Sequence, residues 1–547
     1  MTPLRRNPAQ WLFTGFVALL LAPLIAQGLD RPLASLFHAK PNGISATVAA
    51  LGVALFGCFV AAIRENVKPG VLFAATNLAT IGIGFGFGLH GPGFGALVVV
   101  ASCTTALAHR FLAELPPAID GILTRHWKLS ACYIVMALLT IVQVARVSVF
   151  MGDPTRTDLQ IVPGVKFVET HSCLTAYVRG YELARDVVDN LYLAERWPNT
   201  VEPLVRPETP FSPFDIDSYF YPPPFLLLAG FLAPFRGDFL AQRAAWFGVN
   251  GLLVAIAFWL GARELGGPRW HRPLLLAPLL FGSLPVLFLL QIGNAQTFVV
   301  IVAVLSMLAF ERDKHALGGL GLALATIAKI SPGILGLTLI AQKRWRAVLW
   351  TGGFGVLLVL LSLVPFGTNP LVSWVRYALP RVSSGQAFME ILAHQPSIAF
   401  NFAPSGTAFK LSRLWGVDIG DPWPIARLIN HIVTLGAMVL AVLVGLRQAK
   451  PITGALTSRA LSWMALLFVT ALRSPYAPSY VGFSLLWGMT FLATEVENRR
   501  QGVLLVLLYI AATISAPLPP AQLAILMTIP QMTMIVLSLW LILRRRG

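Results

Sequence analysis

The sequence predicts an all-α, polytopic membrane protein with about 15 transmembrane helices. The 547-residue chain is 56% hydrophobic and only 12% charged, and its mean hydropathy is +0.72. A soluble domain carries roughly 25% charged residues. Apolar runs of the length that spans a bilayer, roughly 20 residues, recur from one end to the other. They are continuous rather than alternating, which disfavours a transmembrane β-barrel.

The net charge of +17 follows from basic residues that sit in short clusters between apolar runs. Two examples are "KRWR" at 343–346 and "RRR" at 544–546. Such clusters are typical of cytoplasmic loops under the positive-inside rule. We therefore expect contacts with membrane lipids and none with nucleic acid, since there is no basic tail and no basic patch interleaved with aromatic residues.

The cysteines give no sign of a zinc site. Cys58, Cys103 and Cys132 lie in apolar runs, and Cys173 alone lies in a polar loop. Neither a CxxC pair nor a Cys/His spacing typical of zinc is present. The sequence therefore predicts no metal site.

The first 108 residues predict an N-terminal four-helix transmembrane module, with Arg5 and Arg6 on the inner side. The first apolar run has no clear small-x-small cleavage site, so it is interpreted as a retained helix. The four helices are expected at 11–28, 44–63, 71–89 and 93–108.

A cytoplasmic linker at 109–128 separates this module from a membrane domain at 129–547. A helix at 129–150 leads outward into the segment 151–221, which holds eleven of the 24 acidic residues. Within it, 175–197 has apolar residues near a 3.6-residue period and predicts an amphipathic helix. The proline-rich stretch 198–224 predicts a structured loop.

The short apolar run 221–235 predicts a dip or half-helix, because it is too short to cross comfortably. With that choice every later basic cluster falls on the inner side, and the loop 366–423 falls outside. The helices 316–328 and 333–341 are expected as two short pieces, broken at "KISP". Broken helices occur in membranes where the backbone faces protein or a wet cavity.

Polar residues that are costly in a membrane collect on the outer side. Ionisable residues at membrane depth are candidates for function, and an outward cavity suits a substrate with an apolar tail and a polar head. The candidates are Asp153, Asp158, Glu169, His171, Tyr221, Asn294, Gln296, Lys329, His394, Gln395, Asn401, Arg473, Tyr476 and Tyr480.

In this order the motifs resemble glycosyltransferase family 87 over about 129–540. They are the acidic loop, "YPPPF", "GNAQ", "AKISPGILGL" with "KRWR", "HQPSIAFNF" and "RSPYAPSYVG". The resemblance implies a C-type glycosyltransferase fold and transfer of a sugar, often mannose, from a polyprenyl-phosphate carrier. It also implies a lipid or glycan acceptor and a site on the periplasmic or exterior face of a bacterial inner membrane.

The family's catalytic aspartate lies in the first outer loop, and its position is assigned to Asp158. Asp153, Glu169 and His171 are reserve candidates for the base. The Tyr-x-x-Gly of the family motif matches Tyr177 and Gly180 some 20 residues later, and four residues before Tyr177 stands Cys173 rather than Asp. Tyr480 stands where many relatives carry His.

Transfer with inversion needs one base for the acceptor hydroxyl and cations or amide donors for the leaving phosphate. Donor contacts are assigned to Lys329, Arg473, Tyr221, Asn294, Gln296, His394, Gln395 and Tyr480. No metal or other cofactor is expected, because a monophosphate leaving group needs less charge neutralisation than a pyrophosphate.

Structural roles remain open for several of these residues. Asp153 and Asp158 suit turns, Lys329 suits an interfacial position, and Asn294 and Gln296 suit a helix cap. The alternative function is a transporter or flippase of a lipid-linked saccharide, which predicts broken helices at corresponding positions of two halves. The chain shows one clear break and no internal repeat. A non-catalytic assembly partner also remains open.

Overall fold

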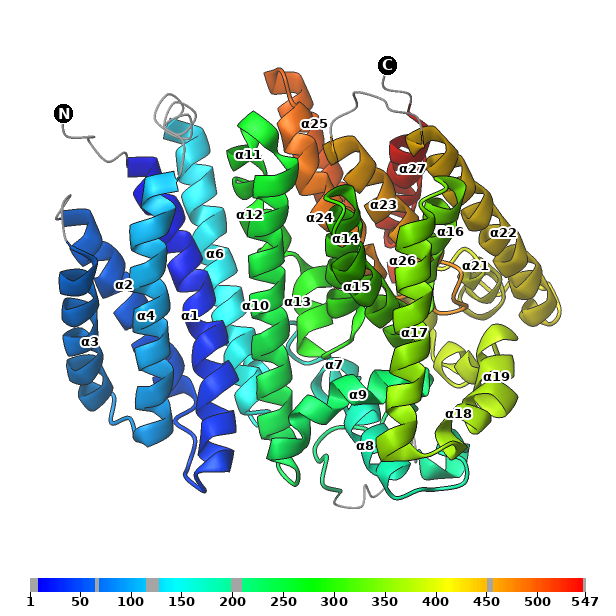
Figure 1. Ribbon diagram of the computed structural model, residues 1–547, viewed down its shortest axis with the longest axis horizontal. Coiled ribbons are helices and arrows are strands. Elements are labelled where there is room, and N and C mark those ends of the chain that lie inside the picture. Colours follow the sequence, from blue (N-terminus) through cyan, green and yellow to red (C-terminus); the bar gives the residue numbers. More distant parts are fainter. Residues whose placement is uncertain (1–7, 64–67, 115–126, 198–208, 450–455, 545–547) are drawn as a thin grey trace.

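The computed structural model describes residues 8–63, 68–114, 127–197, 209–449 and 456–544 (Figure 1). These residues form helices and turns and no β-strand; one isolated bridge joins Asn401 to Pro478. Helices long and apolar enough to cross a membrane number nine among the described residues, or ten if one bent pair counts as a span. The chain is a multi-pass membrane protein.

The prediction of about 15 spans is not confirmed. The nine long elements are α1 (Pro8–Leu36), α2 (Ile44–Ile63), α3 (Pro69–Gly86), α4 (Gly91–Glu114), α6 (Trp127–Gly152), α10 (Phe239–Leu265), α17 (Trp345–Phe366), α22 (Pro422–Gln448) and the continuous pair α26 (Pro520–Leu526) and α27 (Thr528–Leu543). Several segments expected as spans are instead short or bent. Examples are α23 (Leu456–Ala471) and the pair α13 (Leu284–Gln291) and α14 (Gln296–Glu311), which bends by 110°. The helix α15 (His315–Ala328) is short, as expected.

The four expected N-terminal helices are present, and α1 connects them to the rest of the bundle. It packs against α2 and α4 and also against α6 and α10 (Figure 1). Its residues divide between two apolar cores: Ala22 and Ile25 lie in the N-terminal core, and Phe13 and Leu24 lie in the main core. The predicted domain boundary at 108 stays a prediction.

Two glycines set the distance between α1 and α10. A Cβ on Gly28 would lie 2.9 Å from the Cα of Gly248, and a Cβ on Gly248 would lie 2.7 Å from the Cα of Gly28. Small residues allow membrane helices to approach this closely. An ion pair between Arg31 and Asp238, 3.3 Å between Nη2 and Oδ1, joins the same two helical regions.

The helices on both sides of the predicted 109–128 linker extend into it, since α4 runs to Glu114 and α6 begins at Trp127, with 115–126 outside the described residues. The linker as a domain boundary stays a prediction. The amphipathic helix expected at 175–197 ends early, because α8 covers only Leu174–Arg185. Val187 then takes a positive φ of 53°, which an α-helix does not accommodate.

The basic clusters meet on one face of the bundle, as the charge pattern predicts. Glu311 forms ion pairs with both Arg344 and Arg459, and Arg544 pairs with Glu495. In Figure 1 the short helix α11 (His271–Leu274), the start of α25 (Arg499–Thr513) and the end of α27 lie along the upper edge. Which membrane side this face meets stays a prediction.

The opposite face carries the acidic segment, and the short apolar run stays with it. The run forms a 3₁₀ turn at Pro223–Phe225, α9 (Leu226–Ala229) and a second 3₁₀ stretch at Gly230–Phe235. Since α9 packs on α8 and the next helix, α10, makes the crossing, the predicted half-helix is confirmed (Figure 1). The break at Lys329 between α15 and the pair η6 (Ser331–Gly333) and α16 (Ile334–Ala341) is confirmed as well.

Gly248→Leu is expected to lower the free energy of unfolding by roughly 1–3 kcal/mol, because the added side chain would overpack the α1–α10 contact. The measurement is thermal unfolding of the purified protein in detergent. Gly436→Leu is the matched control, since a Cβ there meets nothing within 4 Å. Equal unfolding temperatures for the two variants would contradict the close-contact assignment.

A labelling experiment tests the orientation. Ser384 is exposed on the face of the acidic segment, and Glu497 is exposed on the face of the basic clusters. A single cysteine is placed at one or the other position in a cysteine-free background. Treatment of intact cells with an impermeant maleimide is expected to label the cysteine at 384, and to label the one at 497 only after permeabilisation. The reverse pattern would invert the topology.

Candidate functional site

The candidate functional site lies where the bend between α13 and α14 meets the acidic segment 151–221, which is predicted to lie outside and is called the outer segment below. The bend is made by Ile292–Ala295, and Gly293 provides the turn with a φ of +68°, which glycine adopts without strain. Its backbone groups are bonded from three sides. The amide of Cys173 donates to the carbonyl of Ile292 (2.8 Å), the indole of Trp246 donates to that of Gly293 (2.8 Å), and the amide of Ala295 donates to the hydroxyl of Tyr177 (3.0 Å).

Lys329 reaches this corner from the second break. It ends α15 in an extended conformation, with φ −146° and ψ 132°. Its ammonium donates to Asn294 Oδ1 and Gln296 Oε1, each at 2.9 Å, and lies 6.0 Å from the ring centre of Tyr221. The described structure gives this half-buried cation amide oxygens and no ion pair, which leaves its positive charge available to an anion.

The side-chain amide of Asn294 has a fixed orientation. Its Oδ1 accepts from Lys329 and from the backbone N–H of Gln296 (3.0 Å), both of which can only donate. Its Nδ2 therefore faces the other way and donates to the hydroxyl of Tyr480 (3.2 Å) and to Cys173 Sγ (3.3 Å). Asn294 thus connects the cation to the outer segment.

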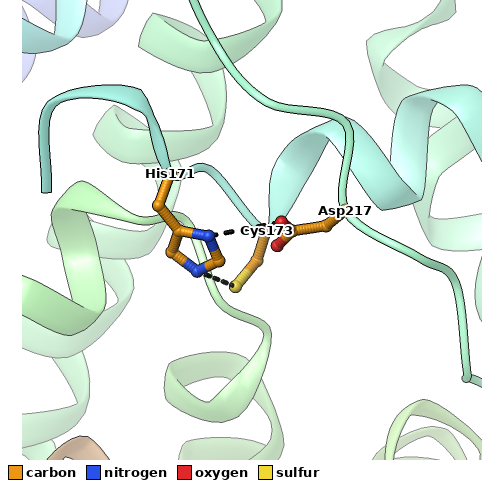
Figure 2. A group of neighbouring side chains, drawn as sticks. All are labelled: His171, Cys173 and Asp217. Atoms are coloured by element: carbon orange, nitrogen blue, oxygen red, sulfur yellow. Dashed lines mark hydrogen bonds and ion pairs between the residues drawn. The ribbon is translucent and has the colours of Figure 1, made fainter. Parts of the chain in front are cut away.

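His171, Cys173 and Asp217 form the other half of the site (Figure 2). His171 Nδ1 lies 3.2 Å from Asp217 Oδ1, and His171 Nε2 lies 3.6 Å from Cys173 Sγ. His171 follows the short helix α7 (Lys166–Thr170), and Cys173 precedes α8. The backbone N–H of Asp217 donates to the hydroxyl of Thr175 in α8 (3.0 Å), and this bond holds the segment of Asp217 next to α8.

The electrostatics of His171 depend on its two neighbours. Burial opposes the charged imidazolium and acts to lower its pKa, but the side chains of Asp217 and Cys173 act in the other direction and prevail. The pKa of His171 therefore lies well above its usual value. The pair of His171 and Asp217 can hold a proton between two groups at the edge of the site.

These three residues also offer ligand atoms for a metal. One nitrogen, one sulfur and one carboxylate oxygen lie within 4.8 Å of one another, and zinc accepts all three types. The two imidazole nitrogens already face different neighbours, so an ion would have to replace one of these contacts. The prediction of no metal stays a prediction.

The structure brings together six of the predicted site residues and separates the rest. Those in the cluster are His171, Tyr221, Asn294, Gln296, Lys329 and Tyr480. His394 and Gln395 are exposed at the start of α20 (Gln395–Ala399), and Arg473 is half-buried after α23. In the described structure none of these three side chains hydrogen-bonds to the cluster.

Asp158 lies outside the cluster, in a 3₁₀ turn at Thr157–Leu159. Its side chain is 63% exposed and pairs with Arg156 at 3.3 Å, and hydrogen bonding from that guanidinium lowers the pKa of Asp158. A lowered pKa makes a carboxylate a weaker base.

The two nearest reserve residues also have local partners. Asp153 accepts from the backbone N–H and hydroxyl of Thr155 (3.1 and 2.6 Å), as in an Asx turn, and Glu169 accepts from Gln160 (3.1 Å).

Sequence reasoning missed Asp217 and Tyr177 as site residues and gave Cys173 no role. Asp217 stands two residues before Tyr219, at the start of the aromatic-proline motif, and this proximity was the available signal. Tyr177 belongs to the Tyr-x-x-Gly pattern, and its hydroxyl lies 3.1 Å from that of Tyr221. Cys173 stands at the position where that pattern carries Asp.

The central part of the chain matches a known protein family. The model of Glycosyltransferase family 87 matches residues 219–475. This segment includes the aromatic-proline motif, the α13–α14 corner and Lys329, whereas His171 and Cys173 lie before it and Tyr480 lies after it. No curated protein and no solved structure matches the chain. The match confirms the resemblance seen in the motifs: this segment is similar to glycosyltransferase family 87.

Proposed function

We propose that this protein transfers a sugar from a polyprenyl-phosphate carrier to a lipid or glycan acceptor at the outer face of the membrane. The similarity of residues 219–475 to glycosyltransferase family 87 supports a membrane glycosyltransferase. The observation that carries the choice of donor is Lys329, a cation at a helix break whose described partners are neutral amides. An ionisable residue at such a depth suits an anionic group that is tethered in the bilayer.

The phosphate would bind at Lys329 with Asn294 and Gln296 as supports. Both amides hold the ammonium through their oxygens, and they orient it without neutralising it. A preorganised cation stabilises the charge that develops on a leaving phosphate. The hydroxyls of Tyr221 and Tyr480 lie in the same cluster, where they could contact the phosphate or the sugar.

The proton of the acceptor hydroxyl would go to the pair of His171 and Asp217. This pair is joined to the phosphate-binding half through Cys173 and Asn294, whereas Asp158 is exposed and paired with Arg156. A base must come within hydrogen-bond reach of the hydroxyl it deprotonates. Asp158 remains the alternative base.

The arrangement of breaks favours transfer over transport. Transporters with repeated halves carry broken helices at corresponding positions of the two halves. In the described structure the two breaks, at 292–295 and at Lys329, flank the same pair of helices, α14 and α15. Both belong to one site.

Lys329→Met is expected to raise the KM for the lipid-phosphate donor by roughly ten- to a hundred-fold with a smaller effect on kcat. Loss of one hydrogen bond to a charged group costs about 1.5–3 kcal/mol. The measurement uses purified protein and a radiolabelled polyprenyl-phosphate sugar. Lys314→Met, at an exposed lysine on the opposite face, is the control. Unchanged donor kinetics would remove Lys329 from the phosphate site.

Asp217→Asn and His171→Gln are expected to lower kcat by roughly 10²–10⁴-fold, the usual contribution of a general base, with expression retained. Asp158→Asn is expected to leave kcat nearly unchanged. An inactive Asp158→Asn beside an active Asp217→Asn would move the base to Asp158. If all three variants kept full activity, the transfer reaction itself would be in question.

A further inference from the structure

Cys173 has a place in the site that the proposed transfer does not use. Its sulfur accepts from Asn294 Nδ2 at 3.3 Å and faces His171 Nε2 at 3.6 Å, so it lies between the two halves of the site. The orientation of Asn294 is set by Lys329 and by the backbone of Gln296, which means that an N–H and not a carbonyl points at the sulfur.

The order of groups is that of an activated nucleophile. Asp217 contacts one ring nitrogen of His171 and the thiol of Cys173 lies at the other (Figure 2). A carboxylate on Nδ1–H presents Nε2 as a proton acceptor, and a base held this way activates a neighbouring thiol. Asn294 Nδ2 donates to the same sulfur.

The other three cysteines have no such surroundings. Cys58, Cys103 and Cys132 belong to the membrane helices α2, α4 and α6. The described residues place no imidazole or carboxylate at hydrogen-bond distance from any of them. A thiol in apolar surroundings is inert, because the thiolate is the reacting form. Cys173 is therefore the thiol that we expect to react first.

We propose that Cys173 is a reactive thiol inside the donor site, with His171 as its base and Asp217 as the group that orients the base. It would take small, soft electrophiles, such as alkyl halides and activated disulfides. With methyl methanethiosulfonate, a bond forms between Cys173 Sγ and the methylthio sulfur. Methanesulfinate leaves, and the thiol proton passes to His171 Nε2.

Modification of Cys173 should switch the site off, and this part rests on the proposed function. A substituent on the sulfur occupies the space between His171 and Asn294 and removes the acceptor of Asn294 Nδ2. Since the same amide holds Lys329, the disturbance would reach the proposed phosphate contact. The contact between the His171–Asp217 pair and the Lys329–Asn294 part of the site would be lost.

The experiment uses the full chain with Cys58, Cys103 and Cys132 changed to Ala, so that Cys173 is the sole thiol. Labelling by methyl methanethiosulfonate is followed by intact mass. We expect one label on the folded protein, and slowing by at least about tenfold in His171→Gln and in Asp217→Asn, as for loss of a general base. Asp153→Asn, in a surface turn of the same segment, should label at the parent rate.

Several results would overturn the proposal. One is a folded parent that is not labelled, and another is a His171→Gln variant that is labelled at the parent rate. A variant that merely unfolds would expose the thiol and speed its labelling, which is the opposite of the expected change. Protection by stoichiometric Zn²⁺, reversed by a chelator, would identify the cluster as a metal site instead.

The chemical readout is independent of sugar transfer. If Cys173 is labelled in a His171-dependent way but no sugar is transferred, the reactive thiol is supported and the proposed function is refuted. If the protein transfers sugar but Cys173 is not labelled, the proposed function is supported and the reactive thiol is refuted. When both hold, methylthiolation should abolish transfer, and dithiothreitol should restore it by reducing the mixed disulfide.

Discussion

The backbone of the α13–α14 corner must be hydrogen-bonded inside an apolar bundle, and the groups that satisfy it are the groups that build the site. Unsatisfied amides and carbonyls cost several kcal/mol in such surroundings. Here the partners come from the N-terminal end of α8 and from α10, through Cys173, Tyr177 and Trp246. The hydrogen bonds that satisfy the bend therefore also hold the outer segment against it, and the same contacts build the fold and the candidate site.

Asn294 lies in this corner and links its backbone to the side chains of the candidate site. Its amide oxygen accepts from Lys329 and from the backbone N–H of Gln296, which fixes the orientation of the amide group. The sulfur of Cys173 and the hydroxyl of Tyr480 then receive the N–H groups. A buried polar network of this kind is stable only when its members are satisfied together, which makes single changes in it costly.

Hydropathy and charge were sufficient for the layout of the bundle because they reflect local constraints. The helix at 44–63, the half-helix at 221–235 and the break at Lys329 each follow from a run of neighbouring residues. The span count was not confirmed, because several apolar stretches are divided by bends that run length does not record. Contacts of Cys173 with Asn294 and of His171 with Asp217 join distant segments, and no period in the sequence encodes them. Asp158 is predicted from its distance to a helix end, but the chain continues past it before it reaches the candidate site.

The same helix that meets the N-terminal module also positions the acidic half of the site. Arg243 in α10 is 1% exposed and donates to the carbonyls of Phe150 and Met151, which lie at the end of α6. Its guanidinium lies over the rings of Phe150 and Phe214, at 4.7 and 4.4 Å from their centres. Phe214 precedes Asp217 by three residues, so one buried cation holds the end of α6 and the start of the Asp217 segment against α10. Because α1 packs on α10 through Gly28 and Gly248, the N-terminal helices support the helix on which the outer segment rests. None of the described residues of the module contacts the candidate site, so its contribution there is structural support of α10.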